Sequence, residues 1–288
     1  MALSETDVTY LQQLAVRRSG NVLTHKHTYL MESWLTPVVE ELGLPNVEAL
    51  VAELKRAPGR YDDQVAAAMT INETSFFRDV QPFEALRRTV IPALIQERSR
   101  TKQLIIWCGA CSSGQEPYTT AITLREYFPQ LASWNVRIVA TDICEEMLER
   151  TRAGLYSQHE VSRGLPSALL AKYFTREGLK WQAHAELRKW IVCRKLNLAG
   201  RWGIMPRFDI VFMRNVLIYF DQAVKESVLQ RTAYNLAPDG YLFLGGGESM
   251  VNLNAPFRRE TIDRTVCFRP EPQPGSQGRP VSLSQSNW

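Results

Sequence analysis

From Gln103 onward, the sequence alternates short apolar runs with longer amphipathic stretches, and no other feature constrains the fold as strongly. The apolar runs predict five buried strands, and three of the stretches between them predict helices: strands over residues 104–108, 136–142, 190–198, 208–213 and 241–245, helices over 115–128, 145–154 and 222–235. Chains in which strands alternate with helices form parallel, doubly wound sheets. We therefore predict an α/β, Rossmann-like fold whose ligand site lies at the carboxyl ends of the strands.

Residues 1–71 have a different pattern, in which apolar residues recur at helical spacing. Asn46 precedes one such stretch and is a candidate N-cap. We predict a small all-helical N-terminal domain here and an α/β domain over residues 72–270. Residues 156–190 break the strand–helix alternation and predict an insertion, whereas residues 271–288 are rich in Pro, Gly, Ser and Gln and predict a disordered tail or linker.

Composition excludes several classes of function. The formal net charge of +4 is small for 288 residues, and no Lys/Arg block interleaves with aromatic residues, so we expect no nucleic-acid partner. The chain has no apolar run of the roughly 20 residues that span a bilayer and no leader-like start, so we expect a cytoplasmic protein without direct membrane insertion. The five cysteines include one CxxC pair, Cys108 and Cys111, but no grouped histidines, so we expect no metal site.

A glycine-containing turn follows the first predicted strand of the α/β domain. Gly109 and Gly114 allow a tight turn there and a close approach of a ligand to the backbone. The next strand ends in Asp142, at the position where doubly wound folds hold a ribose hydroxyl pair. NAD, FAD and S-adenosylmethionine all use this arrangement, and the absence of GxGxxG spacing disfavours the two dinucleotides.

Two further segments place polar residues near the same edge of the sheet. Arg214, Asn215 and Tyr219 follow a buried strand directly. The segment MTINETSFFRD lies between the helical domain and the sheet domain, and we expect its two phenylalanines to pack in the core. Arg78 in this segment either forms a surface ion pair or binds the carboxylate of the cofactor in bidentate fashion.

Five segments carry a family resemblance when they are taken in this order: NETSFFRD, GACSSGQEPYTTAI, ATDI, RNVLIYFD and LAPDGYLFLGGGES. Together they resemble the chemotaxis-receptor glutamate methyltransferases, the CheR family, from about Leu11 to Phe268. The resemblance implies a class I S-adenosylmethionine methyltransferase domain over residues 72–270, with S-adenosylhomocysteine as the product. It also implies that residues 156–190 form a small β-subdomain that docks on receptors.

The resemblance further implies a role for individual residues. Tyr219 would lie near the transferable methyl group as a catalytic residue. Nine residues would contact or flank the cofactor: Asn72, Thr74, Arg78, Glu116, Asp142, Asn197, Leu198, Arg214 and Asn215. An arginine is expected beside the substrate carboxylate, and Arg98 and Arg100 are candidates by their position in the sequence alone.

The implied reaction is transfer of a methyl group to glutamate side chains on the cytoplasmic methylation helices of chemoreceptor-type proteins, by a monomeric enzyme. The insertion is short between Phe174 and Trp190, so we expect no tethering to a C-terminal receptor pentapeptide. Two alternatives remain open. One is a methyltransferase for another protein or a small molecule, and the other is a non-catalytic regulator that senses S-adenosylmethionine or a nucleotide.

Overall fold

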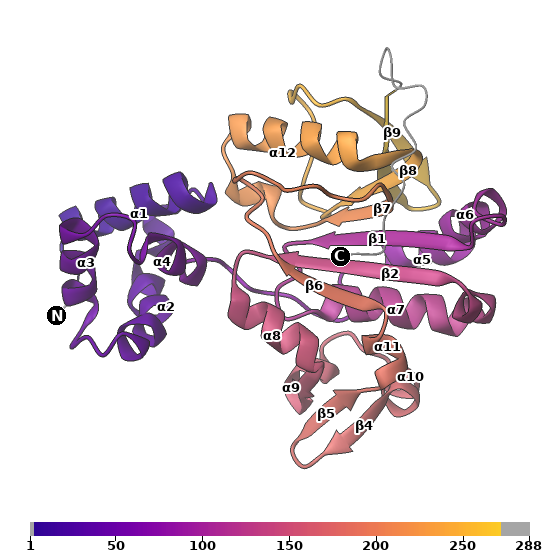
Figure 1. The fold of residues 1–288 in the computed structure, drawn as a ribbon, viewed down its shortest axis with the longest axis horizontal. Coiled ribbons are helices and arrows are strands. Elements are labelled where there is room, and N and C mark those ends of the chain that lie inside the picture. The colour runs from indigo at the N-terminus through magenta and orange to yellow at the C-terminus, as the bar shows by residue number, and fades with distance from the viewer. Residues whose placement is uncertain (1–2, 272–288) are drawn as a thin grey trace.

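The N-terminal helices form a small bundle that lies beside the sheet and is joined to it by one linker (Figure 1). The structure is a computed structural model and describes residues 3–271. The bundle consists of α1 (Glu5–Ser19), η1 (His25–His27), α2 (Thr28–Glu41), α3 (Val47–Arg56) and α4 (Asp62–Ala68). As predicted, Asn46 caps α3, because its side chain accepts a hydrogen bond from the backbone N–H of Ala49. The bundle has its own apolar core, in which Leu11, Leu35 and Leu50 are fully buried.

Seven strands form the main sheet, in the order β6-β2-β1-β7-β8-β10-β9. Five are parallel, namely β1 (Gln103–Gly109), β2 (Asn135–Asp142), β6 (Ile191–Lys195), β7 (Phe208–Met213) and β8 (Leu236–Leu244). The expectation of a doubly wound α/β fold is therefore confirmed. The antiparallel edge pair β9 (Phe257–Ile262) and β10 (Thr265–Pro270) was not expected.

Helices cover both faces of this sheet (Figure 1). Successive strand residues alternate between the two faces, so Ile106 packs in one core and its neighbour Trp107 in the other. On the face of Trp107 lies α12 (Gln222–Asn235). On the face of Ile106 lie α5 (Gln81–Ala85), η2 (Leu86–Val90), α6 (Ile91–Glu97), α7 (Gln115–Tyr127), η3 (Pro129–Ser133) and α8 (Glu145–Ala153).

The stretch that interrupts the alternation contains a second, three-stranded antiparallel sheet with the order β3-β5-β4. Its elements are β3 (Leu155–Ser157), α9 (Gln158–Ser162), α10 (Ser167–Tyr173), β4 (Phe174–Glu177), β5 (Lys180–Ala183) and α11 (Ala185–Arg188). Only Gly178 and Leu179 connect β4 to β5. In Figure 1 this hairpin projects from the side of the molecule that carries α9 and α10.

Three observations concern the described residues alone. No helix within residues 3–271 is long and apolar enough to cross a membrane. In the same range, no group of three or more His, Cys, Asp and Glu side chains is placed to hold a metal ion, and all five cysteines are free. The predicted tail, residues 271–288, lies outside the described range except for Glu271.

Candidate active site

A pocket of about 880 Å³, including its open mouth, lies at the carboxyl ends of the parallel strands, where the helical bundle meets the sheet. In the order β6-β2-β1-β7-β8, the chain winds outward in both directions from the boundary between β1 and β7. Crevices at such switch points bind ligands in doubly wound folds. The pocket walls come from the turns after β1, β2, β6 and β7, from the linker over residues 70–78, and from the end of α1.

The turn after β1 is held in an unusual backbone conformation. Ala110, Ser112 and Gly114 all have left-handed φ angles of 54°, 51° and 94°, and the first two are costly for residues with a side chain. A Cβ at position 114 would lie 2.7 Å from Thr151 Cγ2, so only glycine fits there. Gly109, expected to approach a ligand, instead makes room for the Met213 side chain on the adjacent strand.

Asp142 ends β2 and lies at the floor of the pocket, with 4% of its surface exposed. Its Oδ2 accepts a hydrogen bond from Ser112 N at 2.8 Å, and its Oδ1 accepts one from Cys144 N at 2.9 Å. Burial raises the pKa of this carboxyl, and the backbone donors oppose that rise. Each oxygen can accept a second hydrogen bond, so the carboxylate can receive a pair of ribose hydroxyls.

Arg214, at the end of β7, is almost completely buried and makes two ion pairs. Its Nη1 donates to Glu116 Oε2 at 2.7 Å, and its Nη2 donates to Asp79 Oδ2 and to the carbonyl of Arg78, both at 2.8 Å. Burial raises the pKa of Glu116, and the guanidinium of Arg214 counteracts this. Both residues line the pocket as expected, but their charged groups bind each other and secure the linker.

The linker supplies Asn72, Thr74 and Arg78 to the pocket wall. The backbone carbonyl of Asn72 accepts a hydrogen bond from Ser112 Oγ at 2.8 Å, which fixes the linker against the turn after β1. Arg78 donates from Nη1 to the Glu73 carbonyl at 2.9 Å and makes no ion pair within residues 3–271, so the rest of its guanidinium can meet an anionic ligand. Phe76 is fully buried, which confirms its predicted core position.

The turn after β6 contributes Asn197 and Leu198, both of which line the pocket. The Asn197 amide is engaged with protein groups: Nδ2 donates to the carbonyl of Arg18 at 2.5 Å, and Oδ1 accepts from Ala199 N at 3.0 Å. Asn197 therefore joins the helical bundle to the sheet domain. Leu198 gives the pocket an apolar wall. Its backbone carbonyl accepts a hydrogen bond at 2.8 Å from Nη2 of Arg231, a residue of α12.

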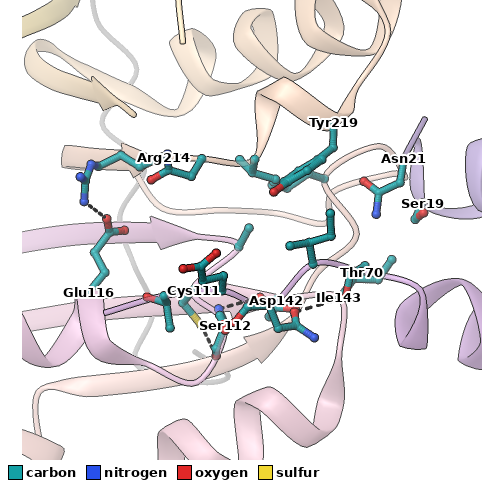
Figure 2. Close-up of a pocket in the computed structure, with 18 of the residues that line it drawn as sticks. Ser19, Asn21, Thr70, Cys111, Ser112, Glu116, Asp142, Ile143, Arg214 and Tyr219 are labelled. Atoms are coloured by element: carbon teal, nitrogen blue, oxygen red, sulfur yellow. Dashed lines mark hydrogen bonds and ion pairs between the residues drawn. The ribbon is translucent and has the colours of Figure 1, made fainter. Parts of the chain in front are cut away.

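Tyr219, in η4 (Leu217–Tyr219), extends over the pocket from the wall opposite Asp142 (Figure 2). A phenol with an ordinary pKa of about 10 is neutral near pH 7, and burial raises the pKa of Tyr219 further. The Tyr219 carbonyl accepts a hydrogen bond from Val22 N at 2.8 Å, so the helical bundle docks on this segment. Asn215, earlier in the segment, has a left-handed φ of 58°.

Arg98 does not belong to this site, and the expectation that it orients a substrate is corrected. It follows α6, and its guanidinium binds Asp209 at 2.8 Å and Asp239 at 2.6 Å. These aspartates lie near the amino-terminal ends of β7 and β8, at the edge of the sheet opposite the pocket. Arg100, the other candidate, is absent from the pocket lining as well.

Several pocket residues were not expected from the sequence. The helical bundle itself contributes Ser19 and Asn21, and the turns add Cys111 and Ile143 (Figure 2). Asn21 also pairs with Phe220 through an isolated antiparallel bridge. Small polar residues at the end of a helix match no ligand motif, so the sequence offers no signal that α1 ends at a binding pocket.

Known proteins resemble this chain over most of its length. Residues 72–266 match the family model described as "CheR methyltransferase, SAM binding domain". The chain is similar to chemotaxis protein methyltransferase 1 of Pseudomonas aeruginosa, with 38% identity over 274 residues that cover 93% of this chain and 99% of the relative. It is also similar to chemotaxis protein methyltransferase Cher2 of Pseudomonas putida, with 36% identity, 88% of this chain and 94% of the relative.

Proposed function

Since the chain belongs to the CheR methyltransferase family, we propose that it transfers a methyl group from S-adenosylmethionine to glutamate side chains of chemoreceptors, forming glutamyl methyl esters. The observation that carries the proposal is the placement of Tyr219 opposite Asp142 in a pocket that also contains Arg78. These residues suit different parts of the methyl donor. Arg78 suits its carboxylate, Asp142 its ribose, and Tyr219 the sulfonium that carries the methyl group.

The chemistry requires little proton transfer from the protein. A glutamate side chain has an ordinary pKa of about 4.3, so it is ionised near pH 7 and attacks without a general base. The protein must align the carboxylate with the methyl group and exclude water, and alignment alone can supply on the order of 7–11 kcal/mol. A neutral Tyr219 can present its ring face to the sulfonium, in a cation–π contact of about 0.5–2 kcal/mol.

The remaining roles extend this proposal to the other parts of the chain. Residues 1–71 act as a helical domain that meets the cytoplasmic methylation helices of the receptor, because the bundle borders the pocket through Ser19 and Asn21. The enzyme acts as a monomer in the cytoplasm. The segment over residues 156–190 docks on receptors without capturing a C-terminal pentapeptide, since only a two-residue turn joins β4 to β5.

The decisive experiment offers methyl-labelled S-adenosylmethionine and chemoreceptor-containing membranes to the purified protein. Label that enters the receptor and leaves as methanol in mild base identifies a carboxyl methyl ester. Label that is stable to base indicates another acceptor group on the receptor. Label that enters only small molecules, or no transfer despite cofactor binding, contradicts the proposal.

A further inference from the structure

The carboxylate of Glu248 holds four backbone N–H groups at the ends of two adjacent strands. Its Oε2 accepts from Gly245 N at 2.7 Å and from Asn215 N at 2.8 Å. Its Oε1 accepts from Val216 N at 3.0 Å and from Ile218 N at 3.2 Å. Three of these donors belong to the segment Asn215–Tyr219, which forms one wall of the pocket.

The segment needs such an acceptor because its own backbone cannot satisfy these groups. Asn215 has a left-handed φ of 58°, and η4 begins two residues later, so the N–H groups of Val216 and Ile218 have no carbonyl of a preceding helical turn. Val216 is 9% exposed and Ile218 48% exposed, so it is the Val216 N–H for which a missing acceptor costs about 1–3 kcal/mol. Hydrogen bonds to an ionised acceptor are also roughly twice as strong as neutral ones.

Packing adds a second constraint at the same place. Met213 and Leu244 are partners in the parallel pair β7–β8, so Asn215 and Gly245 both lie just beyond the paired ends of these strands. A Cβ at position 245 would lie 2.7 Å from Asn215 Nδ2 and 2.9 Å from its backbone N. The two strand ends therefore touch, and one carboxylate bridges them.

We propose that Glu248 is a positioning residue that holds the segment Asn215–Tyr219 in its active conformation. Each of its oxygens accepts two hydrogen bonds, so the carboxylate has no role as a base toward substrate. It acts through Tyr219, the residue assigned to the methyl group, and in this respect the inference rests on the proposed function. Loss of the negative charge releases the segment, and Tyr219 then no longer aligns the methyl group.

The variant that tests this is Glu248→Gln, which keeps the shape of the side chain but turns one acceptor into a donor. Glu226→Gln is the matched control, since the half-buried Glu226 accepts from Asn254 N at 3.1 Å and from Gln222 Nε2 at 3.0 Å outside the segment. We expect kcat for receptor methylation to fall at least about tenfold in Glu248→Gln, with KM for S-adenosylmethionine changed less than about threefold. The control should keep kcat within about twofold of the wild type.

A double-variant cycle separates positioning from general loss of structure. If Glu248 acts through Tyr219, the factor lost in Tyr219→Ala is smaller in the Glu248→Gln background than in the wild type, because two groups that act through one backbone segment are not additive. If the double variant loses activity by the product of the factors lost in the two single variants, the inference is overturned. Should Glu248→Gln fail to fold, Glu248→Asp keeps the charge but withdraws it by one methylene, and a wild-type kcat for that variant overturns it too.

Amide hydrogen exchange gives a readout that does not need methyl transfer. We expect faster exchange at Asn215, Val216 and Ile218 in Glu248→Gln, by at least about tenfold, with unchanged exchange in the core strands. If the wild type transfers no methyl group to receptors, the proposed function fails while this measurement still decides the inference. Unchanged exchange at these three amides overturns it in either case.

Discussion

The guanidinium of Arg214 donates to the carboxylate of Glu116 across 2.7 Å, and so joins the end of β7 to the first turn of α7. The side chain of Arg214 is 2% exposed and that of Glu116 13% exposed. Desolvation raises the pKa of Glu116, and Arg214 opposes that rise. The same guanidinium also binds the Arg78 carbonyl, which belongs to the linker. This pair therefore fixes the pocket wall and the linker together.

Arg214→Ala should lower the free energy of unfolding by about 3–5 kcal/mol near neutral pH, because it leaves the Glu116 carboxylate buried without its cation. Without the guanidinium, burial raises the pKa of Glu116 further above the ordinary value of a glutamate side chain. The folded variant then binds the proton more tightly than the unfolded chain, so its stability falls as pH rises through that pKa. Chemical denaturation at several pH values measures this, and the deficit should shrink toward acid pH.

The double variant Arg214→Ala/Glu116→Gln serves as the control, since it removes the stranded charge along with its partner. We expect it to recover part of the lost stability at neutral pH and to show a weaker dependence on pH. A deficit that is the same at acid and neutral pH would contradict the account of Glu116.

The sequence predicted the parallel strands and the position of the binding site because strands buried on both faces are short, continuous apolar runs, and the helices between them set the spacing of these runs. It placed Asp142 correctly at the end of a strand, since strand ends can be read from apolar patterning. It did not predict the antiparallel pair β9–β10, in which exposed arginines such as Arg258 and Arg259 interrupt the apolar pattern.

The details of the site were harder to predict, because they depend on tertiary pairing. Nothing in the sequence says that Arg214 and Glu116, 98 positions apart, bind each other rather than a ligand. Asn197 is another example, because its partner is the Arg18 carbonyl of a different structural unit. Arg98 was proposed from its position in the sequence alone. In the fold it lies at the amino-terminal ends of the strands, on the side of the sheet away from the pocket.

Arg98→Ala tests that correction. Asp209 is buried beside Arg98 and also accepts a hydrogen bond from Ile105 N, so removal of the guanidinium should cost about 3 kcal/mol of stability. Cofactor affinity should stay unchanged, because Arg98 lies outside the pocket. Denaturation and calorimetry on one preparation measure both. Arg88→Ala, which removes an exposed ion pair with Glu84, should cost less than about 1 kcal/mol.

Asp142→Ala should weaken binding of S-adenosylmethionine by at least about tenfold without unfolding the protein, because it removes the proposed pair of charge-assisted hydrogen bonds to the ribose, each worth about 1.5–3 kcal/mol. The variant also removes the acceptor of the Ser112 backbone N–H, which donates to the Asp142 carboxylate at 2.8 Å. Isothermal calorimetry decides the outcome, with circular dichroism to confirm the fold. Unchanged affinity would remove Asp142 from the site.

Arg78→Ala should weaken cofactor binding more than Arg78→Lys does, and both variants should keep the fold. Within residues 3–271 the side chain makes one hydrogen bond, to the Glu73 carbonyl, so little stability depends on it. A guanidinium meets a carboxylate at two points and an ammonium group at one. Calorimetric titration of the three proteins with S-adenosylhomocysteine gives the order, and equal affinities would show that Arg78 does not bind the ligand.

The segment over residues 156–190 predicts that this enzyme methylates receptors that lack a C-terminal pentapeptide and gains little when one is added. A peptide that adds to a sheet edge needs an exposed strand and room for its side chains. Here β4 is an edge strand, but Gly178 and Leu179 alone connect it to β5. The side chain of Arg176 also closes this turn, donating from Nε to the Gly178 carbonyl at 3.2 Å.

The assay compares initial methylation rates of one receptor fragment without a tail, with an aromatic-acidic pentapeptide, and with a scrambled pentapeptide as the control. A tether raises the local concentration of substrate through its linker, so a working tether would increase the rate at low receptor concentration. The two-residue turn offers no loop that can open around the peptide, and we therefore expect the three rates to agree within about twofold. Direct titration of the free peptide adds an independent measurement, for which we expect no binding at micromolar concentration. A rate gain of about tenfold or more from the intact pentapeptide alone would mean that the edge of β4 accepts the peptide without such a loop.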